Sequence, residues 1–246
     1  MTDRSAWRKA FLEGQATHTV ATLHAAWEFL AEASAVTFGT HVAEPNLTKL
    51  LGQYLESTKQ QARLTGQWSY EVPQSKLEAG PDGGLRRVKC KRTDIKYFSD
   101  RSLPALHLVF EFKYLDHRST PRKKYMGEDG MLRFITGEYS IGDPMAVMVG
   151  ILKFHKEDCV PPLLRFLNSA DAKSSLYMET TNSSQVRAPS EFFSQADFDT
   201  EHLRPMEKGP EHGTIVISHL FLGFPHAARA KTARERREAL TSALED

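Results

Sequence analysis

Apolar residues recur along the chain with two different periods, one typical of helices and one typical of strands. The segment LHAAWEFLAEA, within residues 5–35, places Leu23, Trp27, Leu30 and Ala31 on one face. This spacing predicts a helix with an apolar face turned toward a core. No proline occurs in residues 5–35, and no glycine follows Gly14 there, so nothing in that part of the sequence interrupts the pattern.

A second helix is predicted from Pro45 and Asn46 up to Gly66. Asn46 is the expected N-cap, because its short polar side chain can accept a hydrogen bond from the first helical amides. Gly66 is the expected end of the helix, since glycine is common just after a helix C-terminus. The apolar residues at helical spacing within it are Leu47, Leu50, Leu51, Tyr54 and Leu55.

Three segments that follow have the composition of β-strands. They are WSYEVP (68–73), RRVKCKRTDIKYF (86–98) and the apolar run ALHLVFEFKYL (105–115). The sequence GPDGG before the second strand is a strong turn signal. Because only the short segment 99–104 separates the second strand from the third, these two strands are expected to form an antiparallel hairpin.

The segment 116–130 is polar and basic, contains proline and glycine, and is interpreted as a loop. MLRFITGEYS (131–140) predicts a helix, and MAVMVGILKF (145–154) predicts a buried strand. The order of elements over residues 47–154 is therefore helix, strand, strand, strand, helix, strand. This order predicts a mixed α/β fold of the α+β type, with a mixed sheet flanked by helices.

The C-terminal third gives weaker signals. A helix is expected after Pro161 and Pro162, a polar loop at TTNSSQVRAPS, a strand at 213–224 and a terminal amphipathic helix at KTARERREALTSALED. The chain therefore divides into an N-terminal helical extension, a core and a C-terminal α/β addition packed on that core. Their expected boundaries are 1–43, 44–154 and 155–246.

Composition places the chain among ordinary globular proteins. Of its 246 residues, 40% are hydrophobic and 26% are charged. Two cysteines, Cys90 and Cys159, make neither a disulfide framework nor a zinc site, and they are expected to be reduced thiols. No apolar leader and no run long enough to span a membrane is present, so a cytoplasmic protein is predicted.

The charge is distributed unevenly. The net charge of the chain is only +1, but residues 85–124 contain twelve Lys or Arg and four Asp or Glu, a net charge of +8. A basic block of this kind is typical of a surface that binds a polyanion. The alternative is a solvated surface hairpin that balances acidic residues elsewhere in the chain.

Glu111 and Lys113 interrupt the apolar strand 105–115. Side chains alternate between the faces of a strand, so these two point the same way. Val109 and Leu115 share that face, which indicates partial burial, and burying charged groups is costly. A functional role is therefore favoured over the alternative, an ion pair on a solvent-exposed edge.

Hydrolysis of a phosphodiester would use this combination of residues. A divalent cation neutralises charge and lowers the pKa of a bound water, and Mg²⁺ prefers carboxylate and carbonyl oxygens. If the two hairpin strands pair, Asp94 and Glu111 can approach each other at one edge of the sheet. The backbone carbonyl of Phe112 could supply a third ligand, and Lys113 could orient or help activate the water.

The pattern TDIKYF, followed by Glu111-Phe112-Lys113 seventeen residues after Asp94, resembles the PD-(D/E)xK nuclease superfamily. This resemblance covers about residues 44–154 and implies a restriction-endonuclease-like αβββαβ core. It implies that Asp94 and Glu111 bind the metal and that Lys113 is the catalytic lysine. Thr93 stands where the motif has its proline.

The resemblance also implies further site residues. Many members carry an acid on or just before the first core helix, which here is either Glu44 or Glu56. The helix after the catalytic strand often carries a polar or basic residue near the site, and Arg133 is the candidate. The expected nucleic-acid-binding residues are Arg92, Lys96, Arg122, Lys123, Lys124 and Arg133.

The resemblance implies a Mg²⁺-dependent (or Mn²⁺-dependent) endonuclease that hydrolyses DNA, with RNA as the alternative substrate. It suggests the nuclease component of a bacterial restriction or anti-phage defence system. Such a component would act as a homodimer or in a complex with a separate ATPase, helicase or sensor subunit. Two alternatives remain: a catalytically silent subunit of the same fold that binds nucleic acid or a partner, and an unrelated α+β interaction protein.

Overall fold

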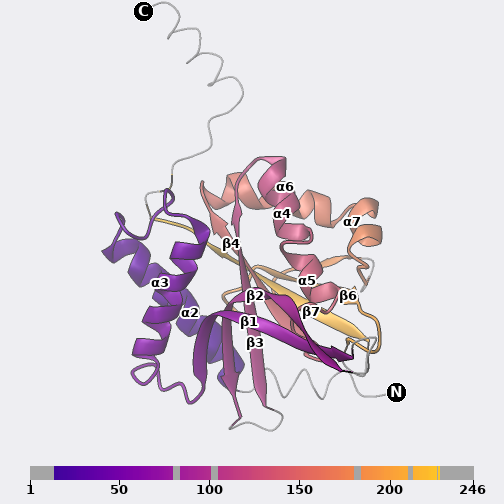
Figure 1. Cartoon of the computed structure of the whole chain (residues 1–246). Coiled ribbons are helices and arrows are strands. Elements are labelled where there is room, and N and C mark those ends of the chain that lie inside the picture. Colours follow the sequence, from indigo (N-terminus) through magenta and orange to yellow (C-terminus); the bar gives the residue numbers. More distant parts are fainter. Residues whose placement is uncertain are drawn as a thin grey trace, which may run out of the picture.

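The chain folds around a seven-stranded mixed sheet with helices on both faces (Figure 1). The computed structural model describes residues 14–79, 84–100, 105–179, 184–209, 213–225 and 227, without the side chains of 72–79 and 85–91. The strand order is β1-β2-β3-β4-β7-β6-β5. The strands are β1 (Gln67–Ala79), β2 (Leu85–Ser99), β3 (Leu106–Leu115), β4 (Met145–Leu152), β5 (Val186–Arg187), β6 (Phe198–Leu203) and β7 (Thr214–Leu222).

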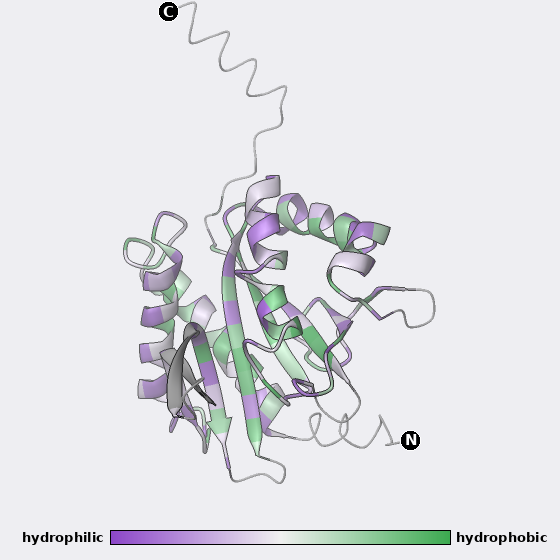
Figure 2. Ribbon diagram, turned by 45° about the vertical axis from the view of Figure 1, so that its right-hand side comes forward, coloured by the Kyte–Doolittle hydropathy of each residue, from purple (hydrophilic) through white to green (hydrophobic). Residues whose placement is uncertain are grey.

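The three central strands β3, β4 and β7 are parallel, and the outer strands pair antiparallel. Every residue of β4 and β7 is buried, as expected for parallel strands with both faces covered. Figure 2 shows the hydrophobic colour along these inner strands. The predicted mixed α/β class, the β2–β3 hairpin and the strands at 145–154 and 213–224 are confirmed.

Two hydrophobic cores lie on opposite faces of the sheet. Helices α2 (Gln15–Ala33) and α3 (Glu44–Thr58) pack on one face, with the even-numbered apolar residues of β3. Helices α4 (Ser119–Met126), α5 (Met131–Ile135), α6 (Lys156–Leu167) and α7 (Ala170–Ser175) lie along the other. The predicted apolar face of α2 is confirmed, because Leu23, Trp27, Leu30 and Ala31 are all buried.

Helix α3 differs from its prediction at both ends. It begins at Glu44 after the N-cap residue Ala43, so Asn46 lies inside the first turn. Pro45 is tolerated there because the first helical amides have no acceptor within the helix. The helix ends at Thr58 rather than near Gly66. Gly66 instead allows a close approach to β2, since a Cβ at this position would collide with the Phe98 carbonyl.

The prediction of a loop at 116–130 is wrong, because α4 lies within it. Pro121 is the third residue of this helix, where a missing amide does no harm. Only Tyr125 and Met126 of α4 are buried, so the sequence carries little helical periodicity. Gly127 is the C-cap, and Gly130 is the N-cap of α5, which confirms a helix within 131–140 but a shorter one.

The C-terminal third adds β5, β6 and β7 to the sheet. Helix α6 begins at Lys156, so the predicted start after the two prolines is wrong; Glu157 and Asp158 in its first turn suit a helix N-terminus. Strands β5 and β6 were not predicted. The GPDGG turn apart from Gly84, residues 101–104 and the terminal helix lie outside the described residues. No described helix combines the length and apolar composition needed to cross a membrane.

Candidate active site at the split between two strands

The site forms where β2 separates from β3. The pairing of these strands runs from Ser99 with Leu106 to Ile95 with Phe110 and then stops. Strand β2 nevertheless remains paired with β1 as far as Leu85. Figure 1 shows the resulting β1–β2 ribbon crossing in front of β3. The last residues of β3 therefore lack a partner strand on this side.

Two carboxylates take over the hydrogen bonds that the partner strand leaves unmade. Asp94 Oδ2 accepts the Phe112 amide at 2.8 Å, and Glu44 Oε2 accepts the Tyr114 amide at 2.9 Å. Buried backbone amides need such acceptors. The split therefore explains physically why an acid from β2 and an acid from α3 meet at the edge of β3.

Lys113 lies at the centre of these groups. Its Nζ is 3.0 Å from Glu44 Oε1, 3.0 Å from Glu111 Oε1 and 3.8 Å from Asp94 Oδ2. It also donates a hydrogen bond of 2.6 Å to the Phe112 carbonyl. The two predicted acids Asp94 and Glu111, and the predicted backbone ligand, the Phe112 carbonyl, therefore all lie within 4 Å of the Lys113 ammonium group.

Arg133 reaches the same carboxylate from α5. Its Nη1 lies 2.6 Å from Glu111 Oε1 and donates to the Tyr139 hydroxyl at 2.9 Å. Tyr139 in turn donates to the Arg92 carbonyl, and Arg133 Nη2 lies 3.2 Å from Asp129 Oδ1. The guanidinium is thus held in position on several sides. Tyr139 was missed by sequence reasoning, because nothing around TGEYS distinguishes it from an ordinary aromatic residue.

Burial dominates the electrostatics of the acids. It raises the pKa of Glu111, and nearby Asp94 raises it further; Lys113 and Arg133 oppose this, and the resulting pKa is about 8. Burial also raises the pKa of Asp94, against the influence of Lys113. Burial alone would lower the pKa of Lys113, but Glu111, Asp94 and Glu44 raise it above its ordinary value. Lys113 is therefore a permanent cation at neutral pH.

The oxygen atoms beside Lys113 are of the type that a hard divalent cation binds. Glu111 is fully buried, and its Oε2 has no hydrogen-bond partner. A buried carboxylate oxygen without a partner is unusual and is consistent with a ligand to a cation. No group of three or more His, Cys, Asp or Glu in the described part of the chain is placed to hold a metal. The oxygen atoms that could hold such a cation are therefore limited to those of Asp94, Glu111 and the Phe112 carbonyl, and water would have to complete the coordination of Mg²⁺.

The structure distinguishes between the two candidate helix acids. Glu44, at the first position of α3, contacts Lys113. Glu56 instead pairs with Lys59, and its Oε2 accepts the Trp68 amide at 2.9 Å. Glu56 therefore joins α3 to the start of β1, and the acid that reaches the site is Glu44.

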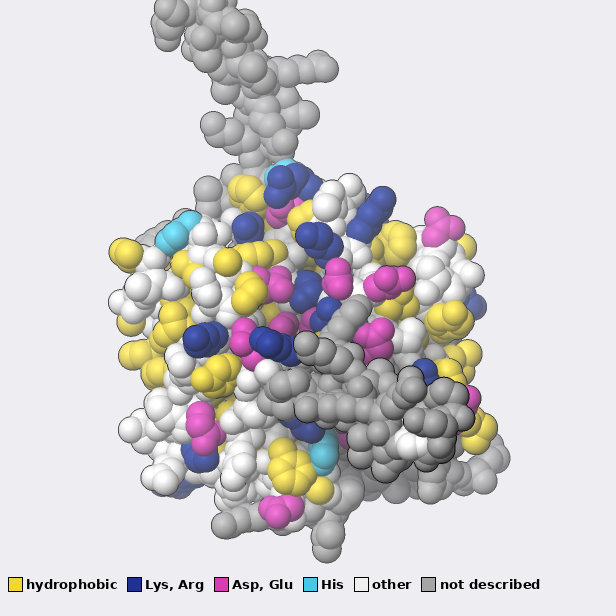
Figure 3. Space-filling model, in the orientation of Figure 1, with side chains coloured by type: hydrophobic (Ala, Val, Ile, Leu, Met, Phe, Trp, Pro, Cys, Tyr) yellow, Lys and Arg dark blue, Asp and Glu magenta, His cyan; other side chains and the backbone are white. Residues whose placement is uncertain are grey.

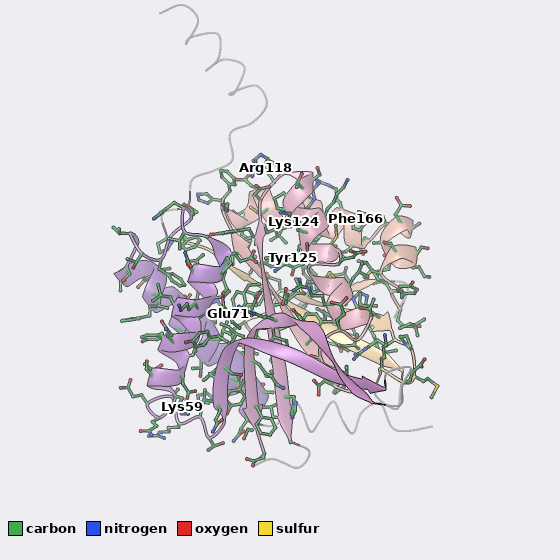
Figure 4. The ribbon with its side chains drawn as sticks, viewed as in Figure 1. Lys59, Glu71, Arg118, Lys124, Tyr125 and Phe166 are labelled. Atoms are coloured by element: carbon green, nitrogen blue, oxygen red, sulfur yellow. The ribbon has the colours of Figure 1, made fainter. Side chains whose placement is uncertain are left out.

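A cavity of about 380 Å³ opens beside Lys113 and has a basic wall. Lys124 lines it, together with Arg118 and Thr120, which were not predicted. Figure 4 shows Arg118 and Lys124 at successive heights on the α4 side of the site, and Figure 3 shows basic and acidic side chains intermingled in the centre of this face. Arg118 is held by Asp116, whose Oδ2 accepts its Nε at 2.7 Å.

The other predicted nucleic-acid-binding residues are spread more widely. Lys123 is exposed on α4, whereas Arg122 donates to the His117 carbonyl. Arg92 is exposed on β2 and lies 3.7 Å from Glu71. Lys96 is partly buried near Asp143 and His107. Of this group, only Lys124 and Arg133 directly border the site.

Two histidines belong to a buried hydrogen-bond chain rather than to the site. His202 Nδ1 lies 2.7 Å from the Leu176 carbonyl, so that nitrogen carries the proton and Nε2 accepts from Thr200. The Thr200 oxygen then accepts from His219 Nε2, and His219 Nδ1 accepts from Tyr125. Both rings are neutral, because burial lowers the pKa of His202 to about 4 and that of His219 well below its ordinary value. His219 is a core residue, as predicted.

Comparisons of the chain with protein-family models, curated proteins and solved structures found no match. The functional argument therefore rests on the residue pattern and on the geometry of the site.

Proposed function

We propose that the protein is a metal-dependent nuclease with a site of the PD-(D/E)xK type. The observation that carries this proposal is the convergence of Asp94, Glu111 and the Phe112 carbonyl on Lys113, with Glu111 Oε2 left without a partner. The order α3, β1, β2, β3, α4–α5, β4 is consistent with a restriction-endonuclease-like core at residues 44–154.

Each residue has a distinct role in this proposal. Asp94 and Glu111 hold the cation, which when bound neutralises charge on the phosphate and acidifies a water. Lys113 orients that water and stabilises the negative charge that develops on the phosphate. Glu44 positions the Lys113 ammonium, and Arg133 favours the ionised form of Glu111.

DNA is the proposed substrate, with RNA as the alternative. Residues 85–124 carry a net charge of +8, and the cavity beside Lys113 is bordered by Arg118 and Lys124. Such groups bind phosphates without reading sequence. The proposal therefore predicts salt-sensitive binding to nucleic acid with little dependence on its sequence.

The test is a cleavage assay with the full chain on single-stranded DNA, double-stranded DNA and RNA, with Mg²⁺, with Mn²⁺ or with a chelator. Lys113→Ala and Asp94→Asn should each reduce cleavage by about two to three orders of magnitude, since each removes a group that stabilises the transition state. Lys49→Ala, an exposed lysine on α3, is the matched control and should retain full activity. Full activity in the Lys113 variant would refute the site assignment.

A catalytically silent subunit that binds nucleic acid or a partner is the second candidate. It is favoured by the absence, among the described residues, of a group of three acids or histidines placed to hold a metal. It is also favoured by the ion pairs of Lys113 with Glu44 and Glu111, in which the ammonium group balances the negative charges without a metal ion. Salt-sensitive DNA binding with no cleavage under any metal condition would establish this alternative.

The proposed biological role follows from the resemblance. A nuclease of this type would be the DNA-cutting component of a bacterial restriction or anti-phage system. It would act as a homodimer or beside a separate ATPase, helicase or sensor subunit. Light scattering of the purified chain, with and without DNA, measures directly whether it forms a homodimer.

A further inference from the structure

A second group of cations lies at the end of β6. Arg204 is only 5% exposed, and its Nη1 donates to the carbonyls of Ser140 (3.0 Å) and Asp143 (3.1 Å). Its Nε and Nη2 are buried without a hydrogen-bond partner. Burial lowers the pKa of Arg204 to about 10, and the nearby Asp143 carboxylate, which forms no hydrogen bond with Nε or Nη2, opposes this only in part. A buried cation with two unpartnered donors is an unusual feature that calls for an anion.

Arg204 lines a cavity of about 460 Å³, a volume typical of small-molecule sites. The residues around it are Ile135, Thr136, Tyr177, Leu203, Arg204, Pro205 and Lys208. None of these residues lines the cavity beside Lys113. The two cavities are therefore separate sites, and a ligand here would not depend on the proposed nuclease chemistry.

One part of this cavity is apolar and unusually exposed. Tyr177 is 57% exposed and Leu203 is 49% exposed, which is high for side chains of this size. The Leu203 amide donates to the Tyr177 carbonyl at 2.8 Å, which ties the two residues together. Tyr177 also has a φ of +50°, a conformation that is uncommon for a residue with a side chain. An aromatic ring and a leucine held in this way offer a packing surface for a planar group.

The other part of the cavity is cationic. Gly137 has a φ of +71°, and a Cβ at this position would lie 2.8 Å from Lys208 Cβ and 3.3 Å from Arg204 Nη2. The missing side chain thus lets Lys208 lie close to the buried guanidinium. Lys208 is exposed and lines the same cavity as Arg204, so its ammonium can pair with an anion bound beside the guanidinium.

We infer that this cavity is a second ligand site, for a small anion that carries a planar ring, with the size and chemistry of a nucleoside monophosphate. The phosphate lies between Lys208 and Arg204, where it satisfies the unpartnered donors. The base packs against Tyr177 and Leu203. The same chemistry has two possible sources, a free nucleotide and the phosphorylated end of a nucleic-acid strand.

The test is calorimetric titration of the full chain with AMP in low salt and with a chelator present. Wild-type protein should bind with a Kd below about 1 mM. Lys208→Ala and Tyr177→Ala change exposed side chains, so they should fold normally, and each should weaken binding by about tenfold. Lys49→Ala, which changes an exposed lysine on α3, should bind like wild type.

Further titrations test the location of the site, the two parts of the ligand and its source separately. Lys113→Ala should retain wild-type affinity for AMP, and loss of binding in that variant would assign the nucleotide to the other cavity and overturn the inference. Inorganic phosphate and adenosine should each bind at least about tenfold more weakly than AMP, since each makes only half of the contacts. Absence of AMP binding, or equal affinity in wild type and the Lys208 variant, would also overturn it. Competition between AMP and a 5′-phosphorylated oligonucleotide would support the site and point to a strand end as the source.

Discussion

Arg133 Nη1 lies 2.6 Å from the buried Glu111 Oε1, and this ion pair joins α5 to β3. The same Glu111 oxygen is 3.0 Å from Lys113 Nζ, whereas Oε2 has no partner. Two cations thus share one oxygen of the carboxylate, and the other oxygen is left for a ligand. Burial has the largest effect on the pKa of Glu111, and Arg133, like Lys113, lowers this pKa and so widens the pH range in which the proposed site can hold a metal.

Removal of Arg133 should shift the pH dependence of cleavage. Arg133→Ala deletes a cation that lowers the pKa of Glu111, so this pKa should rise further. The midpoint of the pH–rate profile should then move upward by about one unit. Arg133→Lys should restore part of the shift, and a purely structural role would change the rate without moving the midpoint. The measurement is the cleavage rate from pH 6 to pH 10 at one fixed metal concentration below saturation, where the protonation of Glu111 limits metal binding.

Metal affinity should itself increase with pH. The pKa of Glu111 is about 8 without a bound metal ion, so below this pH a metal must displace a proton to bind. The apparent Mg²⁺ or Mn²⁺ affinity should therefore increase by about tenfold for each pH unit up to pH 8 and then level off. Titration calorimetry at several pH values measures this. Glu111→Gln should abolish the affinity, and equal affinity at pH 6 and pH 8 would contradict the assignment of Glu111 as a ligand.

The two glutamates of α3 form a matched pair of variants. Glu44→Gln keeps an oxygen for the Tyr114 amide but removes the charge beside Lys113, so cleavage should fall by about tenfold or more. Glu56→Gln changes a residue bonded to Lys59 and Trp68, so cleavage should stay within about twofold and only stability should fall. Cleavage rates and thermal melts of both variants measure this. The reverse order of the two effects on cleavage would rule out the proposed role of Glu44.

The buried histidine chain should affect stability at acid pH. The folded-state pKa of His202 is about 4, below its unfolded value of about 6.5, so the unfolded chain binds the proton more readily. The stability that this group contributes is present above pH 6.5 and is lost as the pH falls toward 4. His202→Gln should therefore retain more of its pH 7 unfolding free energy at pH 4 than wild type does, by about 2–3 kcal/mol. Urea unfolding at pH 7, 6, 5 and 4 measures this difference, and parallel curves for the two proteins would contradict it.

The strands that the sequence predicts correctly are those whose environment leaves a clear pattern. β4 and β7 are buried on both faces and read as continuous apolar runs, and β3 shows two charges in an apolar context. β6 (FDTEHL) is equally well buried at five of its six positions, but its polar side chains are satisfied by distant residues. Asp199, for example, accepts hydrogen bonds from the Ser190 and Ser218 hydroxyls. Such partners cannot be predicted from the periodicity of the sequence. Helix α4 escaped prediction because it buries so little.

The clustering of Asp94, Glu111 and Lys113 was predictable from the sequence, but the structural reason for it was not. The spacing of Asp94, Glu111 and Lys113 suggested the chemistry that is proposed here, and the alternation of side chains along β3 indicated that Glu111 and Lys113 share a face. The choice between Glu44 and Glu56 depended on which part of α3 lies beside the free edge of β3, a tertiary relationship. The contact of Tyr139 with Arg133 could not be predicted either, because it depends on the path of the chain after the end of α5.

The separation of β2 from β3 has a consequence for engineering the protein. Continuous pairing of the two strands would supply the Phe112 and Tyr114 amides with backbone acceptors and release Asp94 and Glu44 from that task. A redesign for higher stability would favour such a repair, yet it would close the gap between β2 and β3 in which these acids and Lys113 meet. Stabilising this edge and keeping its chemistry are therefore opposing aims.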